Sequence, residues 1–242
     1  MNATEKTIDA KLILSILAAG IMSFSGVVVE TAMNVTFPTL MQEFGIGTST
    51  VQWITTGYLL VLASIIPASS YLKKRFPMKA LFLTAICLFI LGTVMAAAAP
   101  VFPILLTGRL IQGVGTGIAL PLMFNIVLEQ VPEERLGLMM GIASLITAMA
   151  PAVGPSLGGL IVSNWGWRMI FVALLPLLLL SLLFGAFSIR QVTETQKATF
   201  QTGEYLLLVL GFACGIARLP SALPALAGSR PKPPEGSHLS DN

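Results

Sequence analysis

The chain reads Leu105-Leu106-Thr107-Gly108-Arg109-Leu110-Ile111-Gln112-Gly113-Val114-Gly115-Thr116-Gly117 near its centre, and this stretch places one arginine inside an apolar run over residues 104–120. An ionisable side chain inside a membrane-spanning run is energetically expensive and marks a functional site. Gly113 and Gly117 follow Arg109 at i+4 and i+8, so all three lie on one face of a helix. Glycines at this spacing let a neighbouring helix backbone approach closely. We therefore expect Arg109 to be functional and to face another helix.

The composition indicates that this is a membrane protein. Hydrophobic residues make up 55% of the 242 residues and charged residues 10%, with a mean hydropathy of +0.86, whereas soluble domains carry about 25% charged residues. A span takes about 20 helical residues, and six runs are long enough. We predict an all-α polytopic membrane protein whose six-helix bundle occupies residues 12–189. The predicted spans are 12–37, 51–72, 80–99, 103–128, 138–163 and 169–189.

The regions outside the bundle are predicted as a cytoplasmic N-terminus (1–11), a cytoplasmic linker (190–204), an aborted seventh helix (205–217) and a disordered tail (218–242). The run 205–217 has 13 residues, about 20 Å of helix, which is too short to span unaided. Five of the 15 prolines lie in the last 25 residues. We interpret the tail as the result of a lost reading frame or a truncated gene near Gly215; a naturally short protein and an engineered fragment remain as alternatives.

Basic residues are distributed unevenly between the two ends of the predicted helices. Nine fall on one side and one, Arg168, on the other, which is a strong positive-inside bias. The N-terminus is therefore predicted to lie on the cytoplasmic side of the plasma membrane. The net charge of +3 reflects this topology, so we exclude nucleic-acid binding. The nine residues are Lys6, Lys11, Lys73, Lys74, Arg75, Lys79, Arg135, Arg190 and Lys197.

The first span contains a second embedded charge, Glu30. Counted from the helix ends, Glu30, Arg109 and Tyr58 all lie about 9–12 Å below the outer surface. A carboxyl in low-dielectric surroundings can bind a proton near neutral pH, and a guanidinium opposes this. We predict that Glu30 is a proton or cation site and that Arg109 sets its proton affinity. The alternative is a carboxylate that reaches interfacial water and has no task.

The fifth predicted span contains two prolines one turn apart, Pro151 and Pro155, which should bend the helix. Gly154 and Gly158 form a small-residue stripe for tight packing, with Gly159 beside it. A bent packing helix without a specific role is the alternative. The basic loop after the second span, containing Lys73, Lys74, Arg75 and Lys79, most simply marks topology.

Enzymatic chemistry finds no support in the sequence. There is no paired acidic metal ligand, no His-Glu motif and no glycine-rich phosphate loop. The one histidine, His238, lies in the tail. Cys87 and Cys214 lie in apolar runs without metal-ligand spacing, and we expect free, buried thiols. We predict no enzyme, no metal and no cofactor.

Several stretches together resemble the major facilitator superfamily, specifically its fourteen-helix drug:proton antiporter branch. The stretches 30–38 and 51–60 resemble that branch's first and second helix signatures, although the acid corresponding to Glu30 is usually Asp. The stretch 109–117 is similar to motif B, and 154–159 to the antiporter motif C. Residues 165–168 match the start of the sixth helix. The loop motif departs from the family: Ser70, Lys74, Pro77 and Met78 replace its Gly, Asp, Gly and Arg.

This resemblance implies a fold of two six-helix bundles, each with inverted repeats, that rock about a central cavity. Fourteen helices need roughly 450 residues, so we expect the chain to be the amino-terminal half of such a transporter. The implied function is proton-coupled export of lipophilic, often cationic, drugs, with a proton gradient as the energy source. In this function Glu30 and Arg109 would couple transport to protons, and Asn34, Tyr58 and Gln112 would line the substrate cavity. The implied partners are the lipid bilayer, protons, drugs and a missing carboxy-terminal half. The alternative is a truncated membrane fragment that transports nothing or depends on a separate partner.

Overall fold

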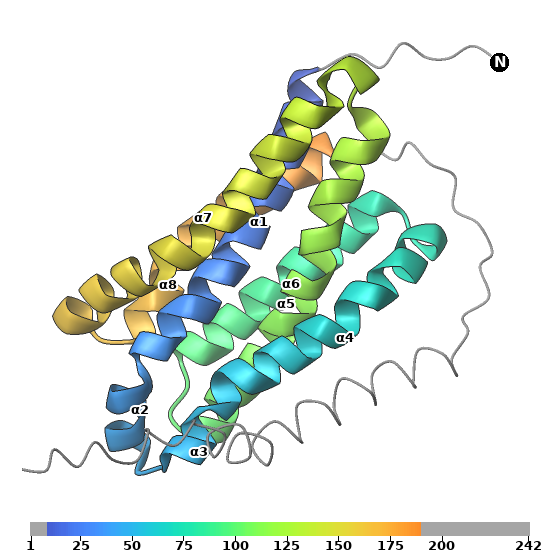
Figure 1. Cartoon of the computed structure of the whole chain (residues 1–242). Coiled ribbons are helices and arrows are strands. Elements are labelled where there is room, and N and C mark those ends of the chain that lie inside the picture. Colours follow the sequence, from blue (N-terminus) through green and yellow to red (C-terminus); the bar gives the residue numbers. More distant parts are fainter. Residues whose placement is uncertain (1–8, 190–242) are drawn as a thin grey trace, which may run out of the picture.

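The computed structural model describes residues 9–189, which form eight α-helices (Figure 1). Six helical segments are long and apolar enough to cross a membrane, which confirms the predicted all-helical, multi-pass fold. The short helices α2 (Phe37–Phe44) and α3 (Thr48–Val51) lie between α1 and α4. The long helices are α1 (Ala10–Val35), α4 (Trp53–Arg75), α5 (Met78–Ala97), α6 (Phe102–Gln130), α7 (Glu133–Trp165) and α8 (Arg168–Ser188). The segments predicted over 190–204, 205–217 and 218–242 lie outside the described residues, as do residues 1–8.

The helix ends follow local rules that shift the predicted bounds. Pro77 and Pro132 stand directly before α5 and α7, where a missing backbone N–H is harmless. As a result, α7 begins at Glu133, five residues before the predicted start. Lys73, Lys74 and Arg75 form the last turn of α4, where cations complement the helix dipole. The prediction that these three residues lie in a loop was therefore wrong.

The helices pack as two related units of three. Helix α1 packs mainly on α7, α8 and α6, while α6 packs mainly on α4, α5 and α1. Exchanging α1 with α6, α4 with α7, and α5 with α8 leaves this set of neighbours unchanged. Successive spans alternate in direction, so α1 and α6 run in opposite senses (Figure 1). The bundle therefore has the arrangement of an inverted repeat, with α1 and α6 central and α4 and α7 on the flanks.

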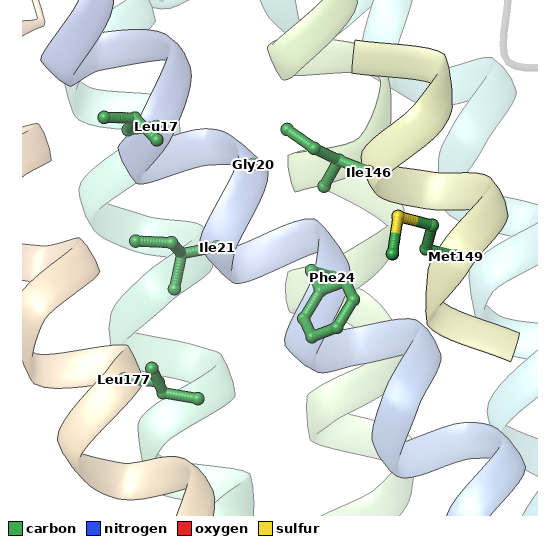
Figure 2. Close-up of a pocket in the computed structure, with 7 residues that line it drawn as sticks. All are labelled: Leu17, Gly20, Ile21, Phe24, Ile146, Met149 and Leu177. Carbon is green, nitrogen blue, oxygen red and sulfur yellow. The ribbon is translucent and has the colours of Figure 1, made fainter. Parts of the chain in front are cut away.

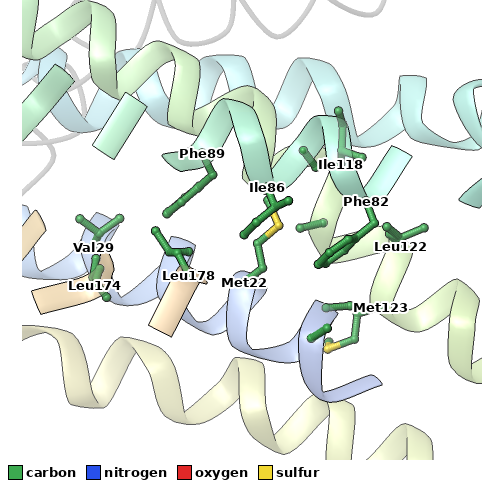
Figure 3. Close-up of a cluster of buried hydrophobic side chains, with 14 of the residues drawn as sticks. Met22, Val29, Phe82, Ile86, Phe89, Ile118, Leu122, Met123, Leu174 and Leu178 are labelled. Atoms are coloured by element: carbon green, nitrogen blue, oxygen red, sulfur yellow. The ribbon is translucent and has the colours of Figure 1, made fainter. Parts of the chain in front are cut away.

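A continuous apolar core joins the central helices to α5 and α8. Figure 3 shows Met22 of α1, Phe82 and Phe89 of α5, Met123 of α6 and Leu178 of α8 turned toward one another. All five side chains are fully buried. Helix α7 contributes only a narrow buried stripe, and most of its remaining surface is exposed apolar side chain. Cys87 of α5 is a free thiol but is exposed, so the expectation that it would be buried was wrong.

Candidate functional site

Arg109 lies in the middle of α6 and is fully buried. Its Nη1 donates a hydrogen bond to Oε1 of Gln112 at 2.7 Å. The guanidinium carbon lies 4.2 Å from the centre of the Tyr58 ring, a cation–π arrangement. The Nε and Nη2 atoms are buried and have no hydrogen-bond partner in the described part of the chain. Since buried donors without acceptors are costly, this guanidinium has a strong affinity for a further acceptor.

Tyr58 joins three helices at this level. Its hydroxyl lies 3.0 Å from the carbonyl oxygen of Gly26 on α1 and 2.9 Å from Oγ1 of Thr116 on α6. A Cβ at Gly26 would lie 2.5 Å from the Thr116 side chain, so this close approach of α1 and α6 requires glycine. We expected Tyr58 to line a cavity, but its side chain is fully buried. Tyr58 instead packs the face of its ring against the Arg109 guanidinium.

Gln112 is also placed differently from our expectation of a cavity-lining residue. Its side chain is fully buried between α6 and α5, because α5 covers that face of α6. Besides accepting from Arg109, it donates from Nε2 to Oγ1 of Thr93 on α5 at 2.8 Å. The sequence analysis missed Thr93, and its only signal was a hydroxyl residue in an apolar helix.

Glu30 and Asn34 occupy the more open side of this site on α1. Glu30 is partly buried and interacts electrostatically with Arg109 and Tyr58. It makes no ion pair with Arg109 within 4.0 Å; the ion pairs in the described residues lie at the two ends of the bundle. Asn34 is exposed and accepts a hydrogen bond from Thr55 of α4 at 2.9 Å. The structure thus brings Glu30, Tyr58 and Arg109 into one electrostatic group without a direct pair between the acid and the arginine.

The glycines after Arg109 admit α4 at close range. A Cβ at Gly113 would lie 3.0 Å from the carbonyl oxygen of Tyr58, and one at Gly117 would lie 2.7 Å from Cβ of Ile65. The opposite face of α6 meets α5 equally closely, since a Cβ at Gly115 would lie 2.7 Å from the carbonyl oxygen of Ala85. Arg109 is therefore carried on a helix held tightly from two sides.

Helix α7 continues through both of its prolines, and Pro151 and Pro155 are exposed. Gly154 and Gly158 face α1: a Cβ at Gly154 would collide with Thr31, and one at Gly158 would lie 2.9 Å from Cβ of Ala32. Gly159 faces open space, with nothing within 4 Å of such a Cβ. Close packing therefore involves Gly154 and Gly158, and the expectation that Gly159 also packs was wrong.

The two ends of the bundle carry polar contacts that join distant segments. At the basic end, Lys73 forms an ion pair with Glu129 at the end of α6 and donates to Asn125 at 3.2 Å. Lys73 therefore ties α4 to α6 in addition to marking topology. Lys74, Arg75 and Lys79 are exposed.

At the opposite end, Glu43 of α2 accepts from the Trp167 indole at 2.6 Å and from Arg168 at 2.7 Å. The Trp167 indole, aided by Arg168, holds the pKa of Glu43 below its usual value, although partial burial opposes this shift. Arg168 also donates to the carbonyl oxygen of Ala99 at 2.8 Å. These contacts join α2, α8 and the segment before α6, and the sequence analysis had not singled out Glu43.

An apolar groove of about 300 Å³ opens between α1, α7 and α8 (Figure 2). It contains none of the predicted site residues and no ionisable side chain. Its lining consists of Leu17, Gly20, Ile21, Phe24, Ile146, Met149 and Leu177. Among residues 9–189, no group of three or more His, Cys, Asp or Glu side chains could hold a metal ion.

Comparison with known proteins identifies the family. The profile of the Major Facilitator Superfamily matches residues 16–233. The chain belongs to this superfamily of transporters. It spans between about a third and two fifths of the length of the curated relatives that it matches. Two solved transporter structures share the fold. One of them, peptide transporter POT in complex with sulfate, matches with a TM-score of 0.66 and 14% identity over 89% of this chain and 46% of that chain.

The relatives at higher identity are bacterial proteins named for drug resistance or as transporters. Lincomycin resistance protein LmrB of Bacillus subtilis is 42% identical over 201 residues, which cover 83% of this chain and 41% of the relative. The MFS-type transporter YhcA of the same organism is 41% identical over 214 residues, 87% of this chain and 40% of the relative. A multidrug resistance protein B homolog of Mycobacterium tuberculosis is 33% identical over 183 residues, 76% of this chain and 34% of the relative. This multi-pass membrane protein is thus similar to bacterial transporters and drug resistance proteins.

Proposed function

We propose that this six-helix bundle is the proton-coupling part of a drug exporter of the fourteen-helix drug:proton antiporter branch. The proposed substrates are lipophilic, often cationic, small molecules. The similarity to lincomycin and multidrug resistance proteins supports the substrate class. The observation that carries the coupling is the buried Arg109, whose Nε and Nη2 have no hydrogen-bond partner among residues 9–189, while Glu30 lies nearby without an ion pair to it.

The mechanism we propose is an exchange at Glu30. The N–H groups of Nε and Nη2 point to the same side of a guanidinium, the geometry that binds a carboxylate through two hydrogen bonds. Ionised Glu30 is drawn to this edge of Arg109, whereas protonated Glu30 is not. Binding and release of the proton would therefore change the distance between α1 and α6, which Gly26 and Thr116 bring into close contact.

A cationic drug competes with the proton for the same carboxylate. Binding of the drug releases the proton from Glu30, and re-protonation from the outer side releases the drug. One proton then enters for each drug cation that leaves. Because positive residues favour the cytoplasmic side, we assign the end of the bundle that carries Lys73 and Arg75 to the cytoplasm.

The test is pH-gradient-driven movement of ethidium and of lincomycin into inverted vesicles that contain the chain completed with the carboxy-terminal half of a relative. Glu30→Gln keeps the size of the side chain but binds no exchangeable proton at its carbonyl, so it should abolish the movement. Glu30→Asp should retain it. Glu133→Gln, on the exposed first turn of α7, is the matched control and should behave as the wild type. Movement driven by the pH gradient in Glu30→Gln at the wild-type rate would refute the proposal.

A further inference from the structure

Thr93 on α5 is a buried hydroxyl that takes no direct part in the proposed proton exchange. Its Oγ1 donates to the carbonyl oxygen of Phe89 at 2.7 Å. The same oxygen accepts from Nε2 of Gln112 at 2.8 Å. A hydroxyl has one proton, and here the Phe89 carbonyl uses it. Thr93 therefore presents only lone pairs to Gln112.

This arrangement decides which way the Gln112 amide points. A hydroxyl oxygen that only accepts must be met by the NH₂ group, so Oε1 is turned to the other side, toward Arg109. There it accepts from Nη1 at 2.7 Å. A rotated amide would place its oxygen against the Thr93 oxygen and its NH₂ against the guanidinium, and both contacts are repulsive. The Thr93 hydroxyl and the Arg109 guanidinium therefore both hold the amide in this orientation, and Thr93 fixes the Gln112 side chain at its Nε2 end.

The backbones of α5 and α6 approach closely enough to permit this contact. A Cβ at Gly92 would lie 2.5 Å from the carbonyl oxygen of Gly108 and 2.8 Å from Cγ of Gln112. Gly92, the residue next to Thr93, is therefore part of a very close contact between α5 and α6. This close approach brings the Thr93 hydroxyl within hydrogen-bond distance of a side chain on α6.

We propose that Thr93 is a positioning residue that acts through Gln112 to hold Arg109 by Nη1, leaving Nε and Nη2 available to Glu30. This inference rests on the proposed function and deepens it, because it assigns the control of the arginine to α5. Without the Thr93 hydroxyl, Nε2 of Gln112 loses the acceptor that it has among residues 9–189, and the Gln112 side chain can leave the position in which it accepts from Arg109. The acid and the arginine would remain, but their geometry would no longer be fixed.

The experiment compares Thr93→Ala with Thr93→Ser, two small side chains that differ only in the hydroxyl, in the full 242-residue chain. Thr93→Val is the isosteric version. Thr107→Val is the matched control, since the exposed Thr107 hydroxyl of α6 donates to the carbonyl oxygen of Pro103 in its own helix, at 2.8 Å. The chain is labelled with ¹⁵N-arginine in nanodiscs, and the side-chain signals of Arg109 are identified by their absence in Arg109→Lys.

In the wild type, the hydrogen-bonded Nη1 should give resolved signals that exchange slowly. These signals should be lost or averaged in Thr93→Ala and Thr93→Val and retained in Thr93→Ser and Thr107→Val. Unchanged Arg109 signals in Thr93→Ala would overturn the inference. If Thr93→Val does not fold, the comparison of the Arg109 signals in Thr93→Ala and Thr93→Ser still tests whether the hydroxyl is required.

Transport separates this inference from the proposed function. In inverted vesicles that contain the completed chain, Thr93→Ala should reduce pH-gradient-driven ethidium movement by about tenfold or more, the size expected for a lost hydrogen bond to a charged group, and Thr93→Ser should restore it. A wild type that moves no ethidium would refute the proposed function, while the Arg109 signals would still test the role of Thr93. Normal transport in Thr93→Ala would refute the positioning role of Thr93 and would leave the proposed function standing.

Discussion

Two adjacent glycines of α7 allow the packing of α7 on α1 to be measured against an internal control. A Cβ at Gly158 would lie 2.9 Å from Cβ, 3.0 Å from Cα and 3.1 Å from the carbonyl oxygen of Ala32. Two of these atoms belong to the backbone of α1 and cannot move independently of that helix. Overpacking of this kind destabilises by about 1–3 kcal/mol. A Cβ at Gly159 meets nothing within 4 Å.

Both substitutions by alanine also raise helix propensity, by about 1 kcal/mol in water. Because this contribution is common to both variants, it cancels when they are compared. We therefore expect Gly158→Ala to be less stable than Gly159→Ala by about 1–3 kcal/mol. The assay is reversible unfolding of the purified chain in mixed micelles with increasing dodecyl sulfate, followed by circular dichroism. Equal unfolding midpoints for the two variants would refute the packing of α7 on α1 described above.

Three further predictions concern individual hydrogen bonds. Tyr58→Phe removes the hydroxyl between Gly26 and Thr116 but keeps the ring under Arg109, so it should cost about 1 kcal/mol in the same assay; an unchanged midpoint would contradict this. Ser181→Ala removes a bond of 2.7 Å from α8 to the carbonyl oxygen of Ala18 and should cost about 0.6 kcal/mol, whereas Ser163→Ala, whose hydroxyl bonds within its own helix, should cost less. The pKa of Glu43 is lowered in the folded protein, so its stabilisation is present above its ordinary pKa of 4.5 and is lost as the pH falls below that value. The unfolding midpoint of the wild type should therefore fall more steeply with acid than that of Glu43→Gln, and parallel curves would contradict this role.

The number of spans could be predicted from the sequence because run length and hydrophobicity determine it directly. The face of α6 that carries Arg109 could also be predicted, since glycines at i+4 and i+8 identify a close helix neighbour by periodicity alone. Counting residues from the helix ends placed Tyr58 and Arg109 at one depth, and the structure brings their side chains into contact.

The polar contacts between helices could not be predicted, because periodicity does not say which helix lies opposite which face. Gln112 was expected to line a cavity, but α5 covers its side of α6, and its partner Thr93 lies 19 residues earlier. Glu43 and Trp167 are 124 residues apart, and neither carries a local signal of the contact. These features require the packing arrangement as well as the pattern along each helix.

Release of protons upon drug binding tests the central claim most directly. Tetraphenylphosphonium is added to the purified chain in weakly buffered solution, and the pH change is recorded for the wild type, Glu30→Gln and Glu133→Gln. If Glu30 exchanges a proton for the drug cation, the wild type and Glu133→Gln should release protons in proportion to the bound cation, and Glu30→Gln should release none. Equal proton release from the wild type and Glu30→Gln, or binding to the wild type without any release, would contradict the claim.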